Sequence, residues 1–282
     1  MLLCELCVSS FFVTQRATEV TQSTTETTEL KMGNMNIELK EHFIRQWKKY
    51  FNNSDLPITF FYTNDLGDTD IFKPSDKRSC IICELQKVRS GHSLAFNSES
   101  VKCGGAKRYM GFAEKIRPNF EYFLSCGIEN KMEGERYIRT PQLVVDLLSK
   151  QKKMNIPGKY IVFKRWDKLN ENDTPDAAIF FATPDILSGL FTLANFDQSE
   201  PDSTIAPFAA GCGSIVYFPF IEKDAERPRT VLGLFDVSAR PCVQEGVLTF
   251  SVPMVKFNKM IGYMDESFLI TDSWKKVQKR IK

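Results

Sequence analysis

The composition of this 282-residue chain is that of a globular protein, with 43% hydrophobic and 12% aromatic residues. Its 37 Lys and Arg residues nearly balance its 35 Asp and Glu residues, so the net charge of +2 favours neither nucleic acid nor an acidic membrane as a partner. Two histidines exclude a His-rich zinc hydrolase centre. Eight cysteines are too sparse for a disulfide-stapled miniprotein, which leaves thiol, metal or cluster chemistry open.

The first 34 residues are predicted to be a tail. Residues 1–13 are apolar, but they lack the preceding Lys or Arg that an export signal requires. The run is also too short to span a bilayer. The Thr-rich stretch that follows cannot bury enough apolar surface to become ordered. Met32 and Met35 stand before the first amphipathic segment, which raises the hypothesis that translation begins there. We therefore expect the globular part to cover residues 35–282.

The globular part opens with apolar residues at helical spacing. The segment NIELKEHFIRQWKKYF, from Asn36 onward, predicts a helix that docks through one apolar face. ITFFYT at 58–63 is apolar, β-branched and aromatic, which predicts a buried strand. CIICELQKVRSG at 80–91 predicts a short helix, with Ser79 or Asp76 as its cap.

Two Thr-Pro pairs mark helix starts in the middle of the chain. The pair at 140–141 supplies an N-cap and a first-turn proline for the helix that follows. KYIVFKRW at 159–166 and DAAIFFAT at 176–183 predict strands. The second Thr-Pro pair, at 183–184, ends the latter strand and starts another helix, so this region predicts a strand-to-helix unit.

The last third of the chain is predicted to be rich in strands. Three candidates lie at 214–220, 230–237 and 247–252, followed by a helix at 254–264 and a closing helix from about Asp272. The alternation of strands and helices predicts an α/β or α+β fold with a mixed β-sheet flanked by helices. No long Gly, Ser or Pro-rich linker interrupts it, which favours a single compact unit, with two lobes as the alternative.

Four cysteines are candidate ligands of a metal ion or an iron–sulfur cluster. Cys80 and Cys83 are separated by two residues, a spacing that lets both thiolates face one soft cation or cluster. Cys103 and Cys126 lie beside glycines, which permit a close backbone approach. No second pair with this spacing is present, so the zinc-ribbon pattern is only half satisfied.

Two other interpretations of the cysteines stay open. Cys80 and Cys83 could form a redox dithiol, because a position at a helix amino end lowers a thiol pKa. They could equally be inert, since a free cysteine packs as a small hydrophobic side chain. For Cys212 and Cys242 we expect such packing.

A second candidate site would hold an anionic small molecule. The basic segment KCGGAKRYMGF exposes backbone N–H groups at its glycines, although it lacks the Gly-Lys-Ser/Thr ending of a Walker loop. A helix start after a strand is another place for such a ligand, and the turn AAGCGS could close over it. The alternatives are a solvated basic loop and an ordinary tight turn. The candidate ligand-binding residues are Gly104, Gly105, Lys107, Arg108, Thr183, Pro184, Gly211 and Gly213.

From about Met35 to Lys282 the chain resembles the ArCR group, domain-of-unknown-function family 169. The resemblance is carried by the segments RSCIICELQKVRSG, KCGGAKRYMGF, RPNFEYFLSCGI, DAAIFFATPDILSGLFTLANFD, GCGSIVYFPF, LGLFDVSARP and MDESFLITDSWKKVQKRI. It implies a cytosolic protein in a reducing, often anaerobic setting where oxygen-sensitive clusters are tolerated. It implies no catalytic residue.

The sequence therefore predicts a cytoplasmic protein that binds an iron–sulfur cluster or zinc through its cysteines and has a redox role. The alternative is a module that binds an anionic small molecule without catalysis. A structural subunit of a redox complex is a third hypothesis. We expect a small-molecule ligand as partner, and neither nucleic acid nor a membrane.

Overall fold

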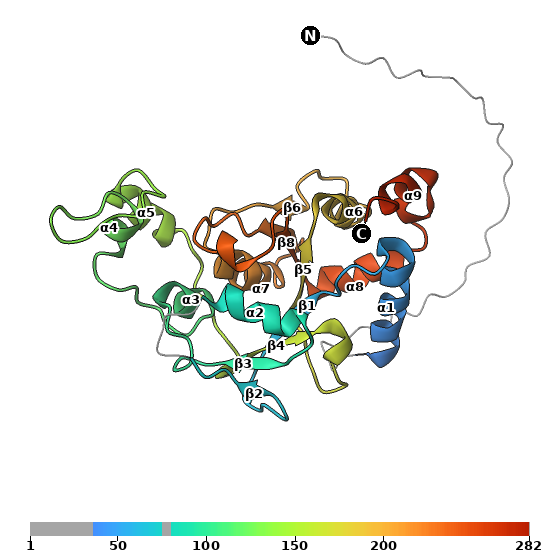
Figure 1. Cartoon of the computed structure of the whole chain (residues 1–282), viewed down its shortest axis with the longest axis horizontal. Coiled ribbons are helices and arrows are strands. Elements are labelled where there is room, and N and C mark those ends of the chain that lie inside the picture. The colour runs from blue at the N-terminus through green and yellow to red at the C-terminus, as the bar shows by residue number, and fades with distance from the viewer. Residues whose placement is uncertain (1–35, 75–79, 282) are drawn as a thin grey trace, which may run out of the picture. The chain divides into compact units, whose positions relative to one another are not determined.

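The computed structural model describes residues 36–74 and 80–281, and their strands form one mixed eight-stranded sheet (Figure 1). The strand order is β2-β3-β4-β1-β5-β8-β7-β6. The pairs β2–β3 and β6–β7 are parallel and the other neighbours are antiparallel. The strands are β1 (Ile58–Thr63), β2 (Asp70–Ile71), β3 (Leu94–Phe96), β4 (Tyr160–Arg165), β5 (Ala177–Ala182), β6 (Thr204–Ile205), β7 (Thr230–Gly233) and β8 (Leu248–Pro253).

Helices cover both faces of this sheet, which confirms the predicted α/β architecture. In Figure 1, α1, α6, α8 and α9 lie on one side of β1 and β5, and α2, α3 and α7 lie on the other. The α-helices are α1 (Ile37–Phe51), α2 (Ile81–Arg89), α3 (Gly104–Tyr109), α4 (Phe120–Leu124), α5 (Pro141–Ser149), α6 (Pro184–Ala194), α7 (Phe218–Glu222), α8 (Met254–Tyr263) and α9 (Asp272–Gln278). The remaining helical turns are η1 (Trp166–Lys168), η2 (Gly213–Tyr217), η3 (Arg240–Cys242) and η4 (Phe268–Ile270).

Two sequence predictions fall outside the described residues. These are the tail over residues 1–34 and the proposed caps Ser79 and Asp76 of α2. Within the described part, Cys80 occupies the N-cap position of α2.

One face of the sheet, which we call the aromatic face, is filled by large rings. The Trp47 ring stacks on Phe51 with centroids 4.1 Å apart, and Phe43 meets Trp166 and Phe257 edge-on at 5.1 and 5.0 Å. Such offset and edge-on pairs are the favourable arrangements of aromatic rings. All five side chains are buried, so this face forms a tightly packed hydrophobic core.

The opposite face, which we call the thiol face, packs α2, α3, η2 and α7 on the sheet. Successive residues of a strand point to opposite faces, so Phe60 and Tyr62 reach this core while Phe61 reaches the aromatic face. The thiol face contains the buried Cys212, and the half-buried Cys80 and Cys242 pack against it.

The predicted strand at 214–220 is wrong, because this segment forms the π-helical turn η2 followed by α7. All five residues of η2 are buried, and a run that is apolar on every side has no periodicity to separate a strand from a buried helix. Close packing requires small residues: a side chain at Gly233 would overlap Ser214. Tertiary packing therefore overrides the β-propensity of this segment.

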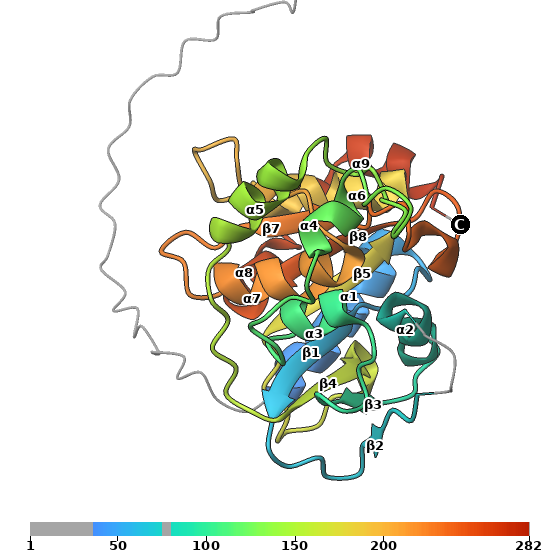
Figure 2. The ribbon, with the colours of Figure 1, turned by 90° about the vertical axis from the view of Figure 1, so that its left-hand side faces the viewer.

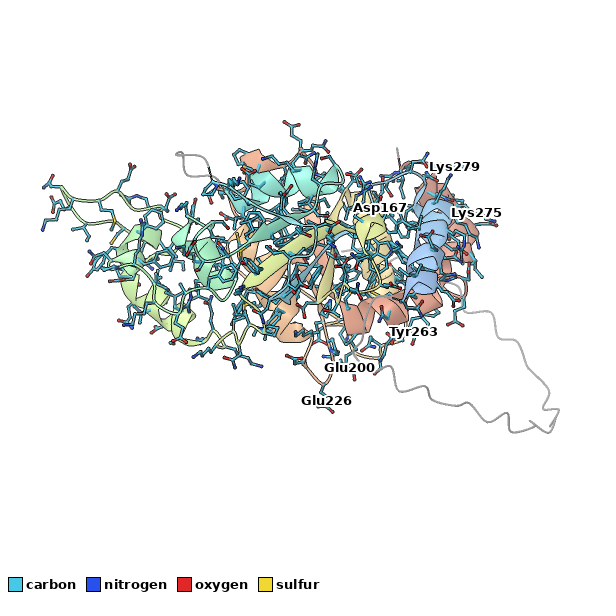
Figure 3. The ribbon with its side chains drawn as sticks, turned by 90° about the horizontal axis from the view of Figure 1, so that it is seen from below. Asp167, Glu200, Glu226, Tyr263, Lys275 and Lys279 are labelled. Atoms are coloured by element: carbon cyan, nitrogen blue, oxygen red, sulfur yellow. A yellow bond between two sulfur atoms is a disulfide. The ribbon has the colours of Figure 1, made fainter. Side chains whose placement is uncertain are left out.

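The helix α9 confirms the closing helix predicted from about Asp272. Trp274 is buried, and its indole N–H donates to the Tyr50 carbonyl at 2.9 Å. Lys275 and Lys279 are exposed at the periphery of the helices (Figure 3). None of the helices in the described residues is long and apolar enough to cross a bilayer.

Candidate cysteine site

Two cysteines that are far apart in sequence form a disulfide at the start of α2. Cys83, in the first turn of α2, is bonded to Cys242 in η3 across a sequence separation of 159 residues. Cys242 was predicted to pack as a small hydrophobic side chain, and the disulfide corrects that prediction. Cys83 is exposed and Cys242 is half-buried, so the bond lies at the surface.

Gly211 joins the segment before η2 to this disulfide. A Cβ at Gly211 would lie 3.1 Å from Ile82 Cγ1 and 3.3 Å from Ala239 Cβ, so the glycine fits closely between α2 and the turn that leads to Cys242. A side chain at this position would require its neighbours to shift by a few tenths of an ångström. The next residue, Cys212, is buried in the hydrophobic cluster of the thiol face, as the sequence predicted.

A tight turn over residues 234–242 carries Cys242 to α2. The predicted strand 230–237 ends early, at Gly233, because Leu234 has a positive φ of 70°. Asp236 then organises the turn: its carboxylate accepts from the backbone N–H groups of Gly211 at 3.1 Å and Ser238 at 3.0 Å. The Asp236 backbone carbonyl accepts from the Ala239 N–H at 3.1 Å, and Ala239 leads directly into η3.

Cys103 enters the site as the N-cap of α3, which lies beside α2 in Figures 1 and 2. Burial raises the pKa of the Cys80 thiol, and negative charge on Cys103 and on Asp236 raises it further. The backbone N–H groups of Ile82 and Cys83 oppose this rise. The electrostatic coupling places Cys80, Cys103 and Asp236 in one neighbourhood.

The same neighbours act on Cys212. Burial raises the pKa of its thiol well above the ordinary value, and the charges of Cys80 and Cys103 add to the rise. Cys80 and Cys212 are therefore neutral thiols at neutral pH. A nearby cation would reverse this preference, because it stabilises thiolates.

We call the five residues Cys80, Cys83, Cys103, Cys212 and Cys242 the cysteine site. They come from α2, the start of α3, the start of η2 and η3. With Cys83 and Cys242 joined, no group of three or more His, Cys, Asp or Glu side chains over residues 36–74 and 80–281 is arranged to hold a metal ion.

Cys126, the fourth predicted ligand, lies elsewhere. It follows α4, which in Figure 1 stands on the far side of α3 from α2. Its exposed side chain lines a surface hollow with Ile128, Met132 and Gly134. Cys126 therefore lies apart from the other three predicted ligands, of which Cys80 and Cys83 lie at the start of α2 and Cys103 at the start of α3. Their role as metal ligands stays a prediction. The glycine next to Cys126 serves a local turn with a φ of +77° at Gly127.

The predicted anion-binding residues are divided between the two faces. Gly104, Gly105, Lys107, Arg108, Gly211 and Gly213 lie on the thiol face, and a Cβ at Gly213 would lie 3.1 Å from Tyr109 Cε1. Thr183 and Pro184 instead start α6, whose apolar side packs on the aromatic face. The Arg108 guanidinium already donates to the Gln151 amide at 3.1 Å and to the Glu114 carbonyl at 3.0 Å.

Sequence analysis missed Cys242 and Asp236 as parts of this site. Neither residue has a neighbour at a spacing typical of metal or redox motifs, and the contact with α2 spans most of the chain. The only signal in the sequence was that residue 242 is a cysteine, and a lone cysteine is most often a buried packing residue.

A comparison with protein families gives one match. The model of the uncharacterised ArCR family, domain of unknown function 169, matches residues 48–262, which is well over half of the chain. This range contains all five residues of the cysteine site. No curated protein and no solved structure matches the chain.

Proposed function

Because this chain belongs to the uncharacterised ArCR family, whose description names no activity, we propose its function from the cysteine site alone. The protein has a redox role, and its reduced cysteines bind an iron–sulfur cluster or a soft metal ion such as zinc. The observation that carries this proposal is the packing of Cys80, Cys212 and Cys242 in one hydrophobic cluster, with Cys83 bonded to Cys242 and Cys103 at the start of α3, which packs on the same cluster.

Reduction of the disulfide supplies the missing ligands. It converts Cys83 and Cys242 into two thiols next to Cys80, Cys103 and Cys212, so five sulfurs become available. Zinc and most iron–sulfur clusters use four cysteine ligands, and an open coordination position permits chemistry on a substrate. The proposed set draws on these five cysteines and omits Cys126.

Charge supports a cationic occupant. Burial is the main cause of the raised pKa values of Cys80 and Cys212, and negative charge on Cys103 and on Asp236 raises both values further. A metal ion or a cluster offsets this negative charge and deprotonates its cysteine ligands. By contrast, raised pKa values make these thiols poor nucleophiles, which disfavours a simple thiol enzyme.

An anion-binding module has less support. The Arg108 side chain that would pair with an anion is engaged by Gln151 and by the Glu114 carbonyl. Thr183 and Pro184 lie across the sheet from the glycine loops. The proposal includes a cytoplasmic location, where disulfides in most organisms are transient and thiols are available for metals.

The test is anaerobic preparation of the full chain after reduction with dithiothreitol. We expect bound zinc, or iron with sulfide and the charge-transfer absorption of thiolate-bound iron. Cys80→Ser and Cys103→Ser should each lose most of the metal. Cys126→Ser is the matched control, because it removes an equally exposed thiol outside the cysteine site.

Two outcomes contradict the proposal. One is a reduced, oxygen-free protein that contains no metal after reconstitution with zinc or with iron and sulfide. The other is a loss of metal in Cys126→Ser as large as that in Cys103→Ser. Circular dichroism of each variant separates a lost site from a lost fold.

A further inference from the structure

Three large apolar side chains are exposed on the two chain segments that lead to the Cys83–Cys242 disulfide. Phe208, Phe235 and Val237 are 61%, 54% and 69% exposed. We call these three residues the apolar rim. Large exposed apolar side chains gathered in one place are typical of protein interaction sites, whereas scattered ones are ordinary.

Local geometry ties the apolar rim to the disulfide. Phe235 and Val237 flank Asp236, and the turn of which Asp236 is part continues into Cys242. Phe208 stands three residues before Gly211, whose backbone N–H donates to the Asp236 carboxylate. A Cβ at Gly211 would lie 3.1 Å from Ile82, the residue before Cys83. The two segments that bear the rim therefore meet at the disulfide.

We propose that the apolar rim is the docking surface for a protein dithiol that reduces the Cys83–Cys242 disulfide. This inference names the redox partner of the cysteine site and so rests on the proposed function. A small thiol needs only access to sulfur, and the exposed Cys83 provides that. A protein reductant also needs a surface on which to dock, and the apolar rim provides one.

The chemistry balances as two thiol–disulfide exchanges. A thiolate of the partner attacks Cys83 Sγ, forming a mixed disulfide, and the electron pair of the broken bond goes to Cys242 Sγ, which takes up a proton. The second thiol of the partner then attacks the partner's own sulfur in the mixed disulfide and releases Cys83, which also becomes a thiol. The partner ends as a disulfide, and Cys83 and Cys242 end as ligands available to a metal.

The experiment compares two reductants on the oxidised full chain. The probes are a thioredoxin-type dithiol protein and dithiothreitol, and the readout is the rate of appearance of alkylatable Cys83 and Cys242. The variant is Phe208→Ser with Phe235→Ser. The matched control is Phe191→Ser, a phenylalanine that is 47% exposed on α6, across the sheet.

We expect the double variant to be reduced about tenfold more slowly by the dithiol protein, since docking residues of this kind dominate binding energy. Its rate with dithiothreitol should match that of the natural chain, and Phe191→Ser should behave as the natural chain with both reductants. A probe protein that lacks its second cysteine should be trapped as a mixed disulfide on Cys83.

Equal rates for the double variant and Phe191→Ser with the dithiol protein would overturn the inference. So would an equal slowing of the double variant by both reductants, because the disulfide itself would then have changed. A different result would overturn the proposed function: the full chain takes up no metal after reduction by dithiothreitol.

Discussion

The two faces of the sheet use the same backbone for different purposes. The aromatic face is closed by rings from α1, β5, η1, α8 and α9, and none of the described cysteines belongs to its core. The thiol face is covered by shorter helices, α2, α3 and α7, and all the described cysteines except Cys126 lie at the starts or first turns of its helical segments or in η3.

This contrast separates stability from chemistry. Aromatic rings on one face provide a core that does not depend on redox state. Short helices on the other face expose backbone N–H groups and sulfur atoms near the surface. Substitutions on the two faces should therefore have separable effects, and three predictions test that separation.

The largest effect is expected on the aromatic face. Phe43→Ala removes a fully buried ring that contacts Trp47, Trp166 and Phe257, and it should lower the free energy of unfolding by about 3–5 kcal/mol. Urea denaturation measures this loss. Metal content per folded molecule should remain unchanged; a parallel loss of metal would show that the two faces are coupled.

A smaller effect is expected from the disulfide. It crosslinks residues 159 apart in sequence, and a crosslink of this kind stabilises a fold by about 2–4 kcal/mol. Cys242→Ser should lose this amount in metal-free urea denaturation, and dithiothreitol should have no further effect on the variant. Cys126→Ser should match the natural chain under both conditions. Identical stability of the natural chain with and without dithiothreitol would contradict the prediction.

The smallest effect concerns the protonation of Cys80. Its pKa is raised from the ordinary 9.0, so its thiolate is scarce at neutral pH and increases only as the pH rises past that value. The midpoint of its iodoacetamide reaction, followed by peptide mass spectrometry, should lie above pH 9.0. Asp236→Asn should lower the midpoint, since Asp236 contributes to the raised pKa. A midpoint at or below 9.0 in the natural chain would refute the prediction.

Elements with local signals could be predicted from the sequence. The Thr140-Pro141 pair starts α5, with the Thr140 hydroxyl accepting from the Leu143 N–H at 3.3 Å. The short apolar run in DAAIFFAT forms the buried strand β5. The segment 214–220 was wrongly predicted as a strand, because all five residues of η2 are buried and the run has no periodicity that separates a strand from a buried helix.

The candidate site was harder to predict from local sequence patterns than the helices and strands were. Cys80 and Cys83 both lie at the start of α2, as their spacing indicated. The glycines after Cys103 serve no close backbone approach, because a Cβ at Gly104 would meet nothing within 4 Å and one at Gly105 only the Cys103 sulfur. The same kind of glycine next to Cys126 was misleading, because Gly127 forms a local turn. The participation of Cys242 depends on a contact across the fold, for which no local pattern exists.

The sheet ends on both sides in very short strands, β2 and β6, with two residues each. Each is paired in parallel with its inner neighbour. A long open edge would offer a row of free backbone groups to the edge of another molecule, and two residues offer too few to continue the ladder. The fold thus resists self-association into extended fibrils through the geometry of its margins, independently of the state of its sulfur atoms.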